Sequence, residues 1–123
     1  DRKRMSSRAK TGREALTQWR VIKRFKDAAL VEAEPKTGRT HQIRVHFSEN
    51  GFPILADTVY GHKKRKSPAV AAAAGKIGRQ ALHAFKIRFI HPRTGEIMEF
   101  TAPLPADMSE ALNILSQSGE NNL

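Results

Sequence analysis

The 123-residue sequence predicts an α+β domain with a mainly antiparallel sheet of hairpins and flanking helices. Two pairs of segments show the two-residue alternation of half-buried strands, and a short link joins the members of each pair. Two other segments have helical spacing, one between the pairs and one after the second pair. The length fits one domain or part of a larger one.

The first hairpin is predicted from strands at 17–25 and 28–34 with the polar link Lys26-Asp27 between them. In the first strand, polar and apolar residues alternate except at Ile22 and Lys23. The second hairpin is predicted from strands at 81–89 and 96–101, joined by a turn at 91–95.

A helix is predicted from Thr40 to Asn50, with Thr40 as its N-cap and Ile43 and Phe47 on one face. Gly51 then supplies a stop, because glycine accepts the left-handed conformation that follows many helices. A last helix is predicted to start at a capping box. The capping pair is Asp107 with Glu110. The buried face of this helix is predicted to consist of Met108, Leu112 and Leu115.

The predicted organisation is a basic arm at 1–14, a body at 15–115 and a polar tail at 116–123. Within the body, 62–78 combines a cationic run with an alanine run and is predicted to be an inserted loop with about two helical turns. The chain opens without Met and runs from the arm into a strand, so we expect that preceding residues have been lost.

The charge balance favours a nucleic-acid partner. Twenty-two Lys and Arg against twelve Asp and Glu give a net charge of +10, which attracts polyphosphate chains; the alternative is a solvated basic surface. The cationic run is expected to contact RNA phosphates, the alternative being a flexible charged loop. It consists of Lys63, Lys64, Arg65 and Lys66.

Composition also excludes several kinds of site. The sequence has no Cys, so disulfides, thiolate metal sites and a Cys nucleophile are excluded, and a reducing, cytoplasmic location is expected in the absence of an export signal. No apolar stretch is long enough to cross a bilayer. His41 and His46 lie five residues apart, unlike metal-binding pairs on one helix face, so no metal is expected.

The densest polar cluster is 37–46, where two arginines and two histidines surround a turn-to-helix junction. Such a junction directs backbone N–H groups and guanidinium groups at a phosphate or carboxylate; the alternative is a helix cap with solvated arginines. Among the aspartates only Asp57 remains a candidate nucleophile, and a turn residue bonded to its own backbone is the favoured interpretation.

The string Thr37-Gly38-Arg39-Thr40-His41-Gln42-Ile43-Arg44-Val45-His46 is similar to the most recognisable motif of RluA/RluD-type pseudouridine synthases. Further blocks follow in the order of that family, and the match runs over 15–115. These blocks are Gly51-Phe52-Pro53-Ile54, Asp57-Thr58-Val59-Tyr60-Gly61, Arg79-Gln80-Ala81-Leu82-His83-Ala84, His91-Pro92-Arg93-Thr94-Gly95-Glu96 and Ala102-Pro103-Leu104-Pro105.

The resemblance implies the C-terminal part of a catalytic domain that isomerises uridine to pseudouridine in rRNA or tRNA without a cofactor or metal. Arg44 would form an ion pair with the catalytic aspartate, which a guanidinium group can hold ionised. Gln42 and Ile43 would shape the pocket, and Leu82 would form an apolar wall against the base. The full set of implied substrate contacts is Arg39, His41, Gln42, Ile43 and Leu82.

The sequence lacks two upstream features of the family. The family's catalytic aspartate lies in an upstream Arg-Leu-Asp motif, and this motif is absent from the 123 residues, as is the upstream strand with a base-stacking Tyr. Arg44 is therefore expected to lack its partner, and the chain alone is expected to be inactive. The missing upstream half is an expected partner. The alternative is a non-catalytic basic RNA-binding module.

Overall fold

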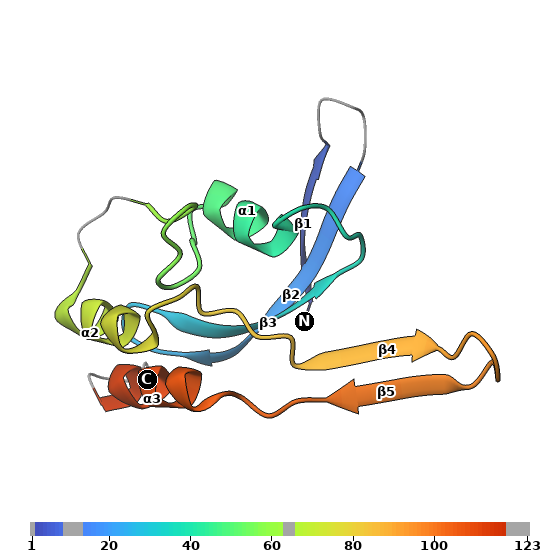
Figure 1. Ribbon diagram of the computed structural model, residues 1–123. Coiled ribbons are helices and arrows are strands. Elements are labelled where there is room, and N and C mark those ends of the chain that lie inside the picture. The colour runs from blue at the N-terminus through green and yellow to red at the C-terminus, as the bar shows by residue number, and fades with distance from the viewer. Residues whose placement is uncertain (1, 9–13, 63–65, 118–123) are drawn as a thin grey trace.

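The computed structural model describes residues 2–8, 14–62 and 66–117. It has the predicted α+β architecture, with antiparallel sheets and helices (Figure 1). The elements in chain order are β1 (Lys3–Arg8), β2 (Glu14–Arg24), β3 (Ala29–Pro35), α1 (Gln42–Glu49), α2 (Pro68–Ile77), β4 (Lys86–Ile90), β5 (Ile97–Thr101) and α3 (Ala106–Gln117).

The first sheet is antiparallel, with strand order β1-β2-β3. The predicted hairpin between β2 and β3 is confirmed, and the Phe25 N–H donates to the Ala28 carbonyl across its turn at 2.9 Å. A β-bulge shifts the register between Val21 and Lys23. The extra residue of the bulge explains why the polar and apolar alternation fails at Ile22.

The prediction of an unpacked basic arm at 1–14 is wrong for 3–8. These residues form β1, in which Met5 pairs with Thr17 of β2 and is only 6% exposed. Arg2 adds ion pairs to Glu32 and Glu34 of β3. Cationic side chains on one face of a strand are compatible with burial of the other face, because successive side chains point to opposite sides.

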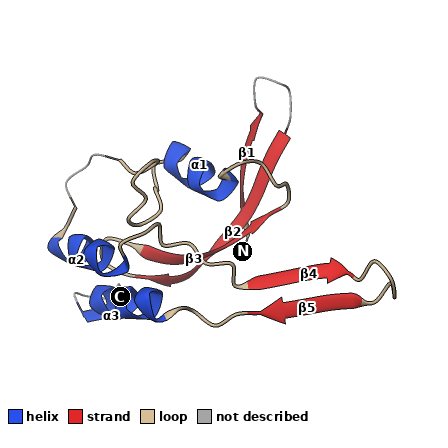
Figure 2. Ribbon diagram, viewed as in Figure 1, coloured by secondary structure: helices blue, strands red, loops and turns tan. Residues whose placement is uncertain are grey.

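Within 62–78, the helical turns predicted for the alanine run form one continuous helix, the ten-residue α2, which packs in the core. Ser67 caps α2 by accepting a hydrogen bond from the Val70 N–H, and Gly78 ends the helix with φ 65°. Alanine favours the helical conformation, and its small side chain allows α2 and α3 to pack closely (Figure 2). Their contact forms the main core, whose buried members are Phe25, Ala73, Ile77, Met108, Ala111 and Leu115.

Helix α1 packs against the first sheet. The Trp19 and Phe47 rings meet edge to face, with centroids 5.7 Å apart. His46 is 2% exposed and shares hydrogen bonds with the Ser7 and Thr17 hydroxyls at 2.9 and 2.8 Å. The helix is thereby tied to both β1 and β2 by polar contacts as well as apolar ones.

Two predicted helix starts are corrected. The N-cap of α1 is His41, in the left-handed region with φ 51° and without a side-chain cap bond, so Thr40 lies one residue before it. The predicted capping box of Asp107 does not form, because Asp107 lies inside the first turn of α3 and its carboxylate binds Arg79 instead.

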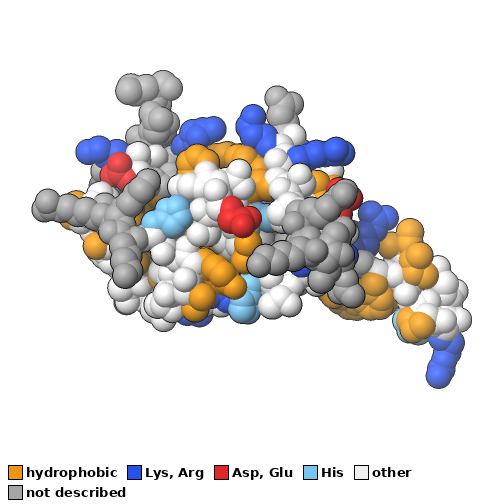
Figure 3. All heavy atoms as spheres, turned by 90° about the horizontal axis from the view of Figure 1, so that it is seen from above, with side chains coloured by type: hydrophobic (Ala, Val, Ile, Leu, Met, Phe, Trp, Pro, Cys, Tyr) orange, Lys and Arg blue, Asp and Glu red, His pale blue; other side chains and the backbone are white. Residues whose placement is uncertain are grey.

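The second hairpin, β4 and β5, projects from the rest of the molecule (Figure 1). Its apolar side chains are exposed, including Ile87, Phe89, Ile97 and Phe100 at 41–62%. Hydrophobic surface is visible along this projection in the space-filling view (Figure 3). Residues 81–85, predicted as the start of the strand, have no regular structure. No helix in the described parts of the chain is long and apolar enough to span a membrane.

Candidate substrate pocket and its ion pair

The structure brings the residues of the implied site into one pocket of about 430 Å³. The loop before α1 and the first turns of α1 form one side, and the irregular segment after α2 forms the other. The predicted residues in its lining are Arg39, His41, Gln42, Ile43, Arg44 and Leu82. Residues 38 positions apart in sequence, Arg44 and Leu82, thus share one cavity.

Gln42 shapes this pocket from within the protein. Its Oε1 accepts hydrogen bonds from the Thr37 hydroxyl at 2.5 Å and the Arg39 N–H at 3.1 Å. Its Nε2 donates to the Leu16 carbonyl at 2.8 Å and to Thr17 Oγ1 at 3.0 Å. Both donors and the acceptor of the amide are therefore in use, and Gln42 fixes the loop that precedes α1.

Arg44 forms a bidentate ion pair with Asp57. Its Nε donates to Asp57 Oδ2 at 2.8 Å, and its Nη2 donates to Asp57 Oδ1 at 2.9 Å. The Asp57 side chain is 0% exposed and the Arg44 side chain 12% exposed. The expectation that Arg44 lacks a partner in this chain is therefore wrong, because α1 and the following loop bring a carboxylate of the chain itself to the guanidinium.

The Asp57 carboxylate binds both Arg44 and the backbone of its own turn. Oδ1 also accepts hydrogen bonds from the Val59 and Tyr60 N–H groups, each at 3.0 Å, as the predicted turn role requires. The hydrogen bonds from Arg44 hold the pKa of Asp57 well below its ordinary range; those from the backbone add to this effect, and burial opposes it. Asp57 is consequently ionised, as a partner for a cation must be.

Tyr60 completes the surroundings of Arg44. The Arg44 guanidinium carbon lies 5.0 Å from the centroid of the Tyr60 ring, a cation–π distance. The Tyr60 hydroxyl shares a 3.0 Å hydrogen bond with Nδ1 of His41. Sequence reasoning did not single out Tyr60; the available signal was the three-residue spacing from Asp57, which places both side chains around one turn.

The wall that carries Leu82 is held without secondary structure. Nη1 of Arg79 donates to the Gln80 and Leu82 carbonyls, both at 3.1 Å, and its Nε and Nη2 bind the Asp107 carboxylate at 2.9 and 3.1 Å. The Ala81 N–H donates to the Leu55 carbonyl at 2.8 Å. These contacts replace the strand pairing that the alternation at 81–89 predicted.

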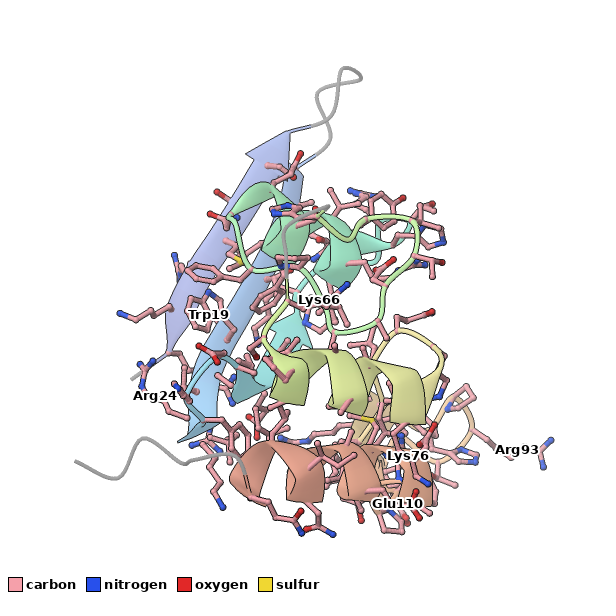
Figure 4. The ribbon with its side chains drawn as sticks, turned by 90° about the vertical axis from the view of Figure 1, so that its left-hand side faces the viewer. Trp19, Arg24, Lys66, Lys76, Arg93 and Glu110 are labelled. Atoms are coloured by element: carbon pink, nitrogen blue, oxygen red, sulfur yellow. The ribbon has the colours of Figure 1, made fainter. Side chains whose placement is uncertain are left out.

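The predicted RNA-contacting run is described only at its end. Lys63, Lys64 and Arg65 lie outside the described residues, and Lys66 is exposed just before α2 (Figure 4). Lys66 does not line the pocket. Among the described residues, no group of three or more His, Asp or Glu side chains is arranged to hold a metal ion.

Comparison with known proteins identifies the family. A family model described as RNA pseudouridylate synthase matches residues 1–49. The Bacillus subtilis RNA pseudouridine synthase YlyB is 46% identical over 88% of this chain, and the Vibrio vulnificus ribosomal large subunit pseudouridine synthase D is 43% identical over 90%. The chain belongs to the RluA/RluD-type pseudouridine synthase family.

The fold of the family agrees with this assignment. A solved structure of human RNA pseudouridylate synthase domain containing 4 is 28% identical, with a TM-score of 0.69, and the match covers 89% of this chain and 45% of that one. The chain spans about a third of the length of the curated relatives that it matches, 33% of YlyB and 35% of the Vibrio protein. It corresponds to part of the RluA/RluD-type catalytic domain.

Proposed function

We propose that this chain is the C-terminal part of an RNA pseudouridine synthase that isomerises uridine in structured rRNA or tRNA. The observation that carries the proposal is the convergence of Arg44, Arg39, His41, Ile43 and Leu82 on one pocket, where the family resemblance places the substrate. The net charge of +10 supports an RNA partner. A cytoplasmic location is part of the same proposal.

In the proposed reaction, the N1–C1′ bond of a flipped-out uridine breaks, the base rotates and C5 joins C1′. The C5 hydrogen is then lost as a proton, and N1 takes up a proton, so the product is an isomer of uridine. Arg44 would hold the attacking carboxylate ionised. Because Asp57 already binds Nε and Nη2, a second carboxylate would be received through Nη1, which takes part in neither of those two bonds. Leu82 would pack against the detached base and limit access of water to it.

The catalytic carboxylate would come from a preceding part of the polypeptide. The exposed apolar hairpin of β4 and β5 supports such a partner, because contiguous apolar surface of this kind is normally covered by protein. The relatives are about three times as long as the matched region, so they contain further residues that could cover this surface. RNA would then bind at the completed cleft, with Lys63–Lys66 as added phosphate contacts.

The test is a fusion of this chain behind the residues of YlyB that precede the matched region. Release of tritium from 5-tritiated uridine in RNA is followed for the chain alone and for the fusion. We expect activity only in the fusion, abolished by Arg44→Ala and retained in Arg93→Ala, a control in the turn between β4 and β5 that points away from the protein (Figure 4).

The alternative is a non-catalytic basic RNA-binding module, which the net charge and the absence of an Arg-Leu-Asp motif in these residues favour. A folded fusion that binds RNA but releases no tritium would support this alternative. Activity of the chain alone would overturn the proposed need for an upstream aspartate. Loss of that activity in the Arg44→Ala variant would then show that the pocket described above is its site.

A further inference from the structure

We propose that Tyr60 and Asp57 are positioning residues that together fix the guanidinium of Arg44 in the pocket. The proposal rests on the proposed function, in which Arg44 supports the catalytic carboxylate. It assigns a role to the block Asp57-Thr58-Val59-Tyr60-Gly61, to which neither the charge pattern nor the family resemblance gave one.

The turn around Asp57 is closed by its own side chain. The Asp57 N–H donates to the Ile54 carbonyl at 3.2 Å, and Oδ1 accepts from the Val59 and Tyr60 N–H groups at 3.0 Å. A Cβ atom at Gly61 would overlap the Asp57 carbonyl oxygen, so the chain can close this tightly only with glycine there. The carboxylate that holds Arg44 thus also determines where Tyr60 lies.

The two residues restrain the guanidinium by different contacts. Asp57 binds two of its nitrogens, at 2.8 and 2.9 Å. The Tyr60 ring lies 5.0 Å from the guanidinium carbon, where a partly desolvated cation is attracted to the aromatic ring. A bidentate pair alone leaves rotation of the long side chain less restricted than a pair with a second contact on the ring side.

Tyr60 is itself anchored at three points. Its N–H binds Asp57, its carbonyl accepts a 2.6 Å hydrogen bond from the Ser48 hydroxyl, and its hydroxyl shares a bond with His41 Nδ1. Ser48 and His41 both belong to α1 or its cap, the same helix that carries Arg44. The ring is therefore fixed relative to the guanidinium by the element that supplies the guanidinium.

The experiment follows the Arg44 Nε–H signal by NMR in the chain without RNA. In Tyr60→Met, which keeps bulk but removes the aromatic ring, we expect this proton to exchange with solvent about tenfold faster, as for loss of a partly desolvated cation–π contact. Tyr60→Phe keeps the ring and should stay within about twofold of wild type. Phe52→Met is the matched control, since Phe52 is 66% exposed and lies outside the pocket lining.

An unchanged Arg44 exchange rate in Tyr60→Met would overturn the positioning role. If that variant lacks a dispersed amide spectrum, Tyr60→Leu supplies the same comparison. In the active fusion, Tyr60→Met should lower kcat about tenfold with little change in KM, and Phe52→Met should change neither. An inactive fusion with the NMR effect intact would refute the proposed function and leave the positioning of Arg44 established.

Discussion

The guanidinium of Arg44 on α1 and the carboxylate of Asp57 form two parallel hydrogen bonds of 2.8 and 2.9 Å across a separation of 13 residues. Because the Asp57 side chain is fully buried, its charge depends on this partner and on the two backbone N–H groups of its own turn. The pair therefore links the stability of the fold to the geometry of the pocket.

Asp57→Asn should destabilise the protein by about 2 kcal/mol or more at pH 7, because it leaves Arg44 without a buried counter-charge. The folded-state pKa of Asp57 is depressed, so its contribution is present above the ordinary carboxyl pKa of about 4 and is lost as pH falls below it. Urea unfolding at pH 7, 5 and 3 measures both effects.

Glu34→Gln is the control for Asp57→Asn. Glu34 pairs with Arg2 and Lys36 at the surface and is 46% exposed, so its removal should change the free energy of unfolding by no more than about 0.5 kcal/mol at pH 7. In Asp57→Asn, the free energy of unfolding should fall less steeply below pH 4 than it does in the wild type. Equal effects of the two substitutions would contradict the special position of the Asp57 pair.

His46 should make the fold sensitive to mildly acidic pH. Burial lowers the pKa of His46, against a smaller raising effect of Glu49, so below about pH 6.5 the unfolded chain binds a proton that the folded one resists. Stability is therefore expected to fall by about 1 kcal/mol between pH 7 and pH 5.5, and His46→Asn should reduce this slope.

Urea midpoints at the two pH values test the role of His46, with His83→Asn as the control because His83 lies outside the buried network. His46→Asn should also lower stability at pH 7.5 by about 1–3 kcal/mol, since it leaves the buried Thr17 hydroxyl without one of its partners. An identical pH slope in wild type and His46→Asn would mean that other groups cause the acid sensitivity.

Gly61→Ala should destabilise the protein by about 1–3 kcal/mol, because the added Cβ meets the Asp57 carbonyl, part of the backbone. Gly75→Ala is a matched control on α2, where nothing lies within 4 Å of the added atom and alanine favours helix. Thermal unfolding followed by circular dichroism compares the two. A neutral Gly61→Ala would show that the 57–61 turn has room to open.

Asp107→Asn should loosen the pocket wall with little change in global stability. Arg79 and Asp107 are 41% and 33% exposed, so the pair mainly orients Arg79 toward the Gln80 and Leu82 carbonyls. Amide exchange at Ala81 and Leu82 should accelerate at least about threefold, which indicates local opening. Hydrogen–deuterium exchange followed by mass spectrometry or NMR measures the exchange rates of these two amides.

The control for Asp107→Asn is Glu110→Gln, which removes a surface ion pair between Glu110 of α3 and Lys76 of α2 (Figure 4). This substitution should leave exchange at Ala81 and Leu82 unchanged, because Lys76 makes none of the contacts that hold the wall. Acceleration in both variants would attribute the effect to general loosening of α3 and not to Arg79.

The sequence by itself determined the features that depend on neighbours along the chain. The hairpin at Lys26-Asp27, the second hairpin, α1 and α3 follow from alternation, turn residues and helical spacing. The 37–46 motif likewise contains most of the residues that line the pocket, although Leu82 comes from a later block. Each of these signals is local, so it can be read without knowing what packs against it.

Tertiary structure decided the features that depend on distant partners. The cationic 3–8 segment is a strand because β2 supplies its hydrogen bonds, and the alanine run is a core helix because α3 covers it. Residues 81–85 are irregular although they alternate, since Arg79 and the Leu55 carbonyl bind their backbone. Asp57 became the partner of Arg44 for the same reason: the energy of a buried charge depends on what three-dimensional packing places beside it.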